Sequence, residues 1–370
     1  MIVPESRDFP TIAYDEERAP RPPENATLPE NTGNAAAGKA LTYNPGKGRC
    51  LACHMLGPDS EQPGDLGPNL SDYGKRGFSH AYTYQQIWDA RVHNQDSAMP
   101  PFGTNELLSA AEIMDIVAYL HTLTTPVAVP GRPKEPQRSR RERVFVAGED
   151  LSVADDYVDA GRAAFRRPGN NGRACASCHA AGEAGDDISR AAARFPRFDE
   201  AKDAVVTLED RVNMCRETHM DSPAIEYGSR AMNVLTSYLR HLSRGQKIQV
   251  SAEGPAAEAF ERGRSLYYRR AGQLNYSCAE CHAKHSGKWL RGQYLRPLDD
   301  VSGDWPKHFI AGHDLGLISM QQRIRHCQIV TRTYPLELGS REYAELEFYM
   351  TVLSEGTPVL APTRSRLRGE

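Results

Sequence analysis

CLACH (residues 50–54), CASCH (175–179) and CAECH (278–282) are three copies of one pattern, CxxCH. This pattern is the attachment signature of c-type haem. The two thiols add to the vinyl groups of the porphyrin, and the adjacent histidine binds the iron as its proximal ligand. The sequence therefore predicts three covalently bound haem c groups. The attachment residues are Cys50, Cys53, Cys175, Cys178, Cys278 and Cys281, and the proximal ligands are His54, His179 and His282.

Zinc binding and thiol redox chemistry are the alternatives for such cysteines. A zinc ribbon needs paired CxxC knuckles about 15–20 residues apart, whereas these motifs begin at residues 50, 175 and 278. A thioredoxin-type CxxC needs a βαβ setting, and no such pattern surrounds these cysteines. Haem attachment of this kind requires export, yet residues 1–10 lack the basic and apolar regions of a signal peptide. We therefore expect a periplasmic protein in its mature form.

The composition fits a multidomain globular protein. The 370 residues are 39% apolar and 25% charged, which suits two or three domains. The formal net charge of −3 gives no indication of a nucleic-acid partner. No apolar run approaches the roughly 20 residues of a membrane span. Strand signals are scarce, so we expect a mainly α fold with three small cytochrome c-like haem domains.

The first domain is predicted over residues 36–125, after an extended N-terminal arm (1–35). Its closing helix has a capping box at Ser109 and Glu112. An apolar face follows in that helix, formed by Ile113, Ile116, Val117 and Leu120. Residues 126–149 are rich in proline and arginine and predict a semi-rigid linker.

The remainder contains an internal repeat. Gly161-Arg162 before Cys175 matches Gly263-Arg264 before Cys278. The segment LEDRVNMC (208–215) matches MQQRIRHC (320–327), and EYGSR (226–230) matches ELGSR (337–341). These matches predict two copies of one haem domain, at 150–247 and 250–358, followed by a C-terminal tail (359–370).

Each haem iron needs a second axial ligand or an open site. Met99, in AMPPFG (98–103), is the candidate in the first domain, where a thioether would favour the reduced iron. The lone cysteines Cys215 and Cys327 occupy the same place in the two repeats, and we expect them to bind iron as thiolates. The alternatives are a disulfide between these two cysteines, or His219 or Met220 as ligand of the second haem.

The charge around the two lone cysteines differs. Residues 319–332, around Cys327, hold three arginines and no acid, whereas residues 207–220, around Cys215, hold two arginines and three acids. A small dianion should therefore be drawn to the third haem, because guanidinium groups suit oxyanions. Arg323 is the best candidate, four residues before Cys327 and on the same face if the segment is helical. A structural salt bridge is the alternative role for Arg323.

The chain resembles the SoxAX cytochromes of bacterial sulfur oxidation. CLACH, GPNL (67–70), YGKRG (73–77), AMPPFG and EIMDIVAYL (112–120) are similar to the SoxX subunit. The two later CxxCH domains, each followed by a lone cysteine, and RIRHCQ (323–328) are similar to a triple-haem-type SoxA subunit. The family normally has two separate chains, whereas here a SoxX-like part precedes a SoxA-like part in one chain.

The resemblance implies an enzyme, an L-cysteine S-thiosulfotransferase that oxidatively couples thiosulfate to a cysteine of the carrier protein SoxYZ. Cys327 would be the thiolate ligand of the active haem, as a plain thiolate or a persulfide, and Arg323 would bind thiosulfate. The Met99 haem would pass two electrons to an acceptor cytochrome c. Two other functions stay open: a thiosulfate dehydrogenase that forms tetrathionate, and an electron-transfer cytochrome without a substrate.

Overall fold

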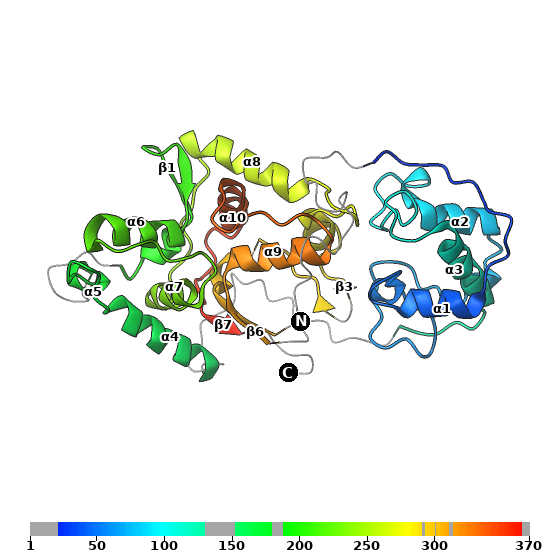
Figure 1. Cartoon of the computed structure of the whole chain (residues 1–370), viewed down its shortest axis with the longest axis horizontal. Coiled ribbons are helices and arrows are strands. Elements are labelled where there is room, and N and C mark those ends of the chain that lie inside the picture. The colour runs from blue at the N-terminus through cyan, green and yellow to red at the C-terminus, as the bar shows by residue number, and fades with distance from the viewer. Residues whose placement is uncertain are drawn as a thin grey trace.

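The computed structural model describes residues 21–129, 152–179, 188–290, 293–299, 301–310 and 314–364. Most of the predicted linker and the first 20 residues of the predicted arm lie outside these ranges. About 45% of the described residues are helical, and strands are few among them. Its helices form three units in chain order, with the first at one end and the second at the other (Figure 1). Among the described residues, no helix combines the length and apolar character needed to cross a bilayer.

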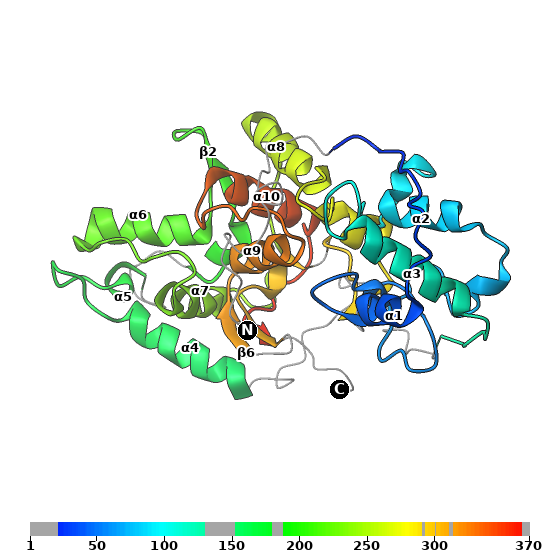
Figure 2. The ribbon, with the colours of Figure 1, turned by 45° about the vertical axis from the view of Figure 1, so that its right-hand side comes forward.

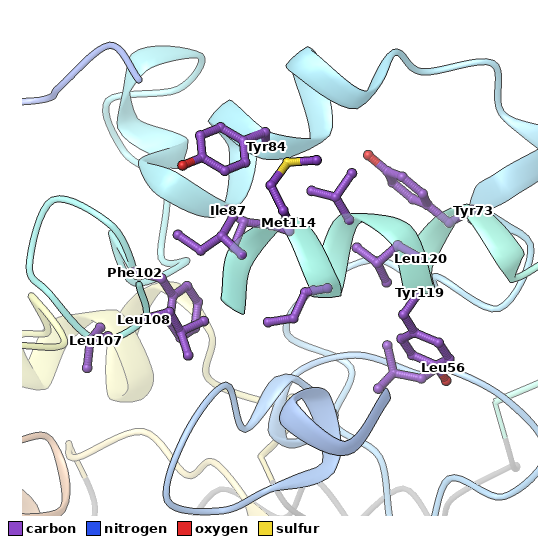
Figure 3. Close-up of a cluster of buried hydrophobic side chains, with 13 residues drawn as sticks. Leu56, Tyr73, Tyr84, Ile87, Phe102, Leu107, Leu108, Met114, Tyr119 and Leu120 are labelled. Atoms are coloured by element: carbon purple, nitrogen blue, oxygen red, sulfur yellow. The ribbon is translucent and has the colours of Figure 1, made fainter. Parts of the chain in front are cut away.

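The first unit consists of α1 (Ala35–Tyr43), α2 (His80–Trp88) and α3 (Ala110–Thr122). The predicted capping box of α3 is confirmed, because Ser109 Oγ accepts from the Glu112 amide and Glu112 Oε2 accepts from the Ser109 amide. The predicted apolar face of α3 is buried in a core that α2 and the connecting loops complete (Figure 3). Met114 is 2% exposed and belongs to this core.

The second unit holds α4 (Ser152–Phe165), α5 (Cys175–Cys178), α6 (Leu208–Met220) and α7 (Arg230–Leu242). Strands β1 (Arg197–Asp199) and β2 (Ala204–Val206) form an antiparallel hairpin before α6. Helix α6 contains Cys215, the lone cysteine of the first repeat copy, and begins at a capping box formed by Thr207 and Asp210.

The third unit repeats this plan with α8 (Ala257–Tyr268), α9 (Met320–Val330) and α10 (Arg341–Leu353). Strands β3 (Trp289–Leu290) and β4 (Gln293–Tyr294) form a short hairpin. Strand β5 (Lys307–Ile310) pairs antiparallel with β6 (Asp314–Ile318) and parallel with β7 (Thr363–Arg364). Helix α9 lies near the middle of the molecule in both views (Figures 1 and 2).

The first and last helices of each unit cross at a glycine. A Cβ on Gly38 of α1 would lie 1.9 Å from the Asp115 carbonyl oxygen of α3. A Cβ on Gly161 would lie 2.1 Å from the Val234 carbonyl oxygen, and a Cβ on Gly263 would lie 2.1 Å from the Glu345 carbonyl oxygen. A methyl group cannot fit at any of these crossings, so glycine lets the two helix backbones touch.

The second and third units share part of one core. Ile248 and Val250, 1% and 3% exposed, pack in one cluster with residues of both repeats, among them Val205 and Phe348. Val359, 0% exposed, belongs to the same cluster, and Ala361 is also 0% exposed. The predicted boundary of a tail at residue 359 is therefore wrong, because residues 359–364 are built into the third unit and its sheet.

Candidate haem sites

In the first unit, a backbone cradle fixes the predicted proximal histidine. His54 Nδ1 hydrogen-bonds the Pro68 carbonyl oxygen at 2.8 Å. Gly67 lies flat against the ring, since a Cβ there would lie 2.2 Å from His54 Cε1. Burial lowers the pKa of His54, against the opposing effect of the Pro68 carbonyl. The imidazole is thus neutral with Nε2 free of this bond, which is the form and orientation an iron ligand needs.

The third unit reproduces this arrangement. His282 Nδ1 hydrogen-bonds the Arg296 carbonyl oxygen at 2.7 Å, and the sequence separation of 14 equals that of the pair in the first unit. Burial lowers the pKa of His282, and the positive charge of Arg323 lowers it further, while the Arg296 carbonyl raises it. Arg323 of α9 therefore lies within electrostatic range of this histidine.

In the second unit, His179 Nδ1 is buried without a hydrogen-bond partner among the described residues. Cys175 and Cys178 begin and end the short helix α5, directly before it. Burial raises the pKa of the Cys175 thiol; Arg216 lowers it and Cys215 raises it. Cys215 and the attachment site are thus neighbours, as the repeat predicts.

The surroundings of the first attachment cysteine favour its protonated thiol. Burial raises the pKa of the Cys50 thiol to about 12, and the adjacent Cys53 raises it as well. No disulfide joins any of the eight cysteines, all of which lie within the described residues. The alternative of a disulfide between Cys215 and Cys327 is accordingly not what the structure contains. Thiol pairs at each motif, the anchoring of His54 and His282 through Nδ1, and the cradle at Gly67 fit covalently bound haem c.

The predicted sixth ligands lie in different settings. Met99 is half-buried at the edge of the first core, and its amide donates to Ser97 Oγ at 3.1 Å. Cys215 and Cys327 are half-buried on α6 and α9. Of the two alternatives, His219 is exposed, whereas Met220 is 4% exposed with its sulfur 3.9 Å from Cys175 Sγ. This contact packs Met220 against a cysteine of the attachment motif.

Helix α9 places Arg323 and Cys327 one turn apart, as the sequence predicted. The helix begins at a capping box formed by Ser319 and Gln322. Its position is fixed from the buried side, where Gln321 Nε2 donates to Glu347 Oε2 of α10 at 3.0 Å. Arg323 is half-buried and Arg325 is exposed, so Arg323 is the arginine of this helix that faces the His282 side.

The first unit docks on the third through contacts that the sequence analysis missed. The buried amides of Asn105 and Gln273 pair reciprocally: Asn105 Nδ2 donates to the Gln273 carbonyl at 2.8 Å, and Gln273 Nε2 donates to the Asn105 carbonyl at 3.0 Å. Trp289 N donates to Asp65 Oδ1 at 2.6 Å. No local pattern marks Asn105, Gln273 or Asp65, because each is a single polar residue in a loop.

Comparison with known proteins agrees with the fold. Residues 160–248 match the family described as SoxA/TsdA, cytochrome c domain, and residues 33–120 match cytochrome C oxidase, cbb3-type, subunit III. The L-cysteine S-thiosulfotransferase subunit SoxA of Rhodovulum sulfidophilum is 33% identical over 208 residues, covering 56% of this chain and 70% of the relative. The chain belongs to the SoxA family.

Other SoxA proteins and a solved structure extend this result. The SoxA subunit of Hydrogenobacter thermophilus is 31% identical and covers 64% of this chain and 90% of the relative. The crystal structure of SoxXA from P. pantotrophus superposes with a TM-score of 0.53 at 30% identity, over 58% of this chain and 79% of that chain. The predicted resemblance is confirmed, and the cytochrome c domains carry covalently bound haem c. The additional cytochrome match at 33–120 is consistent with a SoxXA-like fusion.

Proposed function

We propose that this chain is a haem-dependent L-cysteine S-thiosulfotransferase, which couples thiosulfate oxidatively to a cysteine of the carrier protein SoxYZ. The observation that carries the proposal is the placement of Arg323 and Cys327 on one helix, with the Arg323 charge beside His282. The third unit thus holds a guanidinium that suits a dianion, a cysteine on the same helix, and the predicted haem ligand His282. Curated SoxA relatives bear the name of this activity.

The proposed cofactors are three haem c groups. His54, His179 and His282 would each bind one iron beside the attachment cysteines, and Met99, Cys215 and Cys327 would each supply a second ligand. Support comes from the equal anchoring of His54 and His282, and from the closeness of Cys215 to Cys175. When bound, haem supplies one-electron transfer at each iron.

The overall reaction joins two sulfurs and releases two electrons. The carrier thiol and thiosulfate lose one proton and two electrons, and the product is the carrier cysteine S-thiosulfonate. Arg323 binds and orients thiosulfate through charge-assisted hydrogen bonds. Cys327, as a thiolate or a persulfide, provides the sulfur next to which the substrate is held.

The two electrons leave through the first unit to an acceptor cytochrome c, in the periplasm. Docking of the first unit on the third supports this route, since Asn105, Asp65 and Gly46 of the first unit all hydrogen-bond residues of the third. The helices of the second unit lie at the opposite end of the molecule (Figures 1 and 2). The second haem is therefore proposed to lie off this route.

Substitution of Cys327 tests the proposal, with Cys215 as its matched control in the other repeat. Haem-loaded Cys327→Met should lose thiosulfate-dependent mass gain on SoxYZ, whereas Cys215→Met should retain it. Undiminished coupling by Cys327→Met at full haem content would refute the assigned role. Turnover that proceeds equally without the carrier, with tetrathionate as product, would instead indicate a thiosulfate dehydrogenase. Absence of any thiosulfate-dependent haem reduction would indicate a plain electron carrier.

A further inference from the structure

A buried carboxylate lies inside the third attachment motif. Glu280, in CAECH, is 2% exposed. Its Oε1 accepts from Arg270 Nη2 at 2.8 Å and from Lys284 Nζ at 2.8 Å. The Arg270 side chain is 18% exposed and that of Lys284 is 45% exposed. Arg270 is thus more buried than Lys284, and water screens its attraction to the Glu280 carboxylate less.

The same guanidinium reaches the first unit. Arg270 Nη1 donates to the Ser97 carbonyl oxygen at 2.9 Å, and Nη2 donates to the Asp96 carbonyl oxygen at 3.2 Å. Ser97 is in turn tied to Met99, because its hydroxyl oxygen accepts from the Met99 amide at 3.1 Å. Arg270 therefore links Glu280, between the cysteines of the third motif, to the two carbonyls that precede Met99.

This link is held from the third unit. The carboxylate of Glu280 is buried, and a buried charge without a counter-charge is strongly destabilising. The attraction between Glu280 and Arg270 therefore directs the guanidinium fork to one place, where its remaining N–H groups meet the loop of the first unit. A planar fork can serve a carboxylate and two carbonyls at once, which a lysine ammonium on a flexible stem does less well.

The second unit provides an internal comparison. Arg167 lies eight residues before Cys175, as Arg270 lies eight residues before Cys278. Arg167 is exposed, and Ser177 stands at the position of Glu280 in the motif, where its hydroxyl oxygen accepts from the Ala174 amide. The hydrogen bonds described between the first unit and the repeats all go to the third unit. The buried acid and the shielded arginine thus occur together in the copy on which the first unit docks.

We propose that Arg270, held by Glu280, is a positioning residue that fixes the Met99 loop and so keeps the Met99 sulfur on the iron of the first haem. This inference rests on the proposed ligation by Met99. It makes the ligation of one haem dependent on the attachment segment of another, across the docking surface between the units.

Arg270→Gln in the haem-loaded full chain tests this positioning role, with Arg167→Gln as the matched control. The readout is the long-wavelength charge-transfer band that a ferric haem shows when a thioether sulfur binds the iron. Raising the pH displaces such a ligand, and the equilibrium constant for its loss should rise about tenfold in Arg270→Gln. Arg167→Gln should match the wild type. Equal behaviour of Arg270→Gln and wild type would overturn the proposal.

Two further variants distinguish failure of the proposed Met99 ligation from failure of the proposed role of Arg270. Glu280→Gln leaves the Arg270 fork in place but removes the charge that directs it, so a smaller shift in the same direction is expected. Met99→Ala should abolish the band. If Met99→Ala retains it, the proposed ligand is wrong, and the positioning role is then judged from amide hydrogen exchange of residues 94–105. Faster exchange there in Arg270→Gln alone would support the role, and unchanged exchange would overturn it.

Discussion

At the scale of the residue, the proposed activity depends on two side chains of α9. Arg323 and Cys327 lie one turn apart, and the Arg323 charge acts on His282. The corresponding residues of α6 are Arg211, which is exposed, and Cys215. The two repeats thus share a frame for a sulfur ligand, while Arg211 has acids nearby in sequence, Glu209 and Asp210, that have no counterpart around Arg323.

Arg323→Gln should lower kcat/KM for thiosulfate about 10- to 100-fold, because a charge-assisted hydrogen bond to a dianion is lost. The matched variant Arg211→Gln should leave this value unchanged. Initial-rate measurements with SoxYZ at several thiosulfate concentrations check both. Equal losses in the two variants would show that Arg323 acts through the fold and not through the substrate.

A second residue-scale feature is the buried acid Glu347. Burial and the neighbouring Glu209 raise its pKa to about 8, against the hydrogen bond from Gln321 and the charge of Arg240. An unfolded glutamate has a pKa of about 4.3. Between these values the folded chain binds more protons than the unfolded chain, so this group makes the free energy of unfolding fall as the pH rises.

Glu347→Gln should therefore flatten the fall in stability between about pH 5 and pH 8, where one group contributes up to about 1.4 kcal/mol per pH unit. At pH 8 the variant should melt at a higher temperature than the wild type. Calorimetry across this range measures both, with exposed Glu342→Gln of the same helix as the control. A pH profile parallel to that of the wild type would contradict the assigned protonation.

At the scale of the element, the sequence predicted the features that depend only on neighbouring residues. The capping box at Ser109 and the buried face of α3 follow from a pattern within a few residues, and the structure confirms them. The repeat at Gly161 and Gly263 was also visible in the sequence. The sequence did not show why glycine is needed at these two positions. Each glycine lies against a backbone carbonyl more than 70 residues away in the chain.

Gly263→Ala tests the helix crossing of the third unit. Alanine would favour α8 by about 1 kcal/mol as an isolated helix, but its methyl would lie 2.1 Å from the backbone oxygen of Glu345, which cannot rotate away. Overpacking of this kind costs about 1–3 kcal/mol or more, so a lower melting temperature is expected. Exposed Ser265→Ala on the same helix is the calorimetric control. A stabilised Gly263→Ala would show that the two helices separate readily.

At the scale of the whole molecule, contacts between residues far apart in the chain could not be predicted from local sequence patterns. The attachment motifs, the repeat and the lone cysteines were predicted because each is a short pattern with its own chemistry. The pairing of Asn105 with Gln273 was not, because 168 residues separate the two. The insertion of Val359 into a core shared by the repeats is likewise set by packing, as no local signal distinguishes it from a tail.

Asn105→Ala should loosen the docking of the first unit on the third. It leaves the buried Gln273 carbonyl without the donor at 2.8 Å, and such a loss costs about 1–3 kcal/mol. Amide hydrogen exchange of residues 270–277 should accelerate, while exposed Asn31→Ala leaves it unchanged. Protection equal to that of the wild type in Asn105→Ala would mean that other contacts suffice to hold the surface closed.

Electron paramagnetic resonance of the oxidised, haem-loaded chain tests whether the sulfur of Cys327 binds iron. The account predicts low-spin ferric signals of thiolate-ligated haem, one of which disappears in Cys327→Met while another disappears in Cys215→Met. A Cys327→Met spectrum identical to that of the wild type would mean that the sulfur of Cys327 does not bind iron, and would contradict the account.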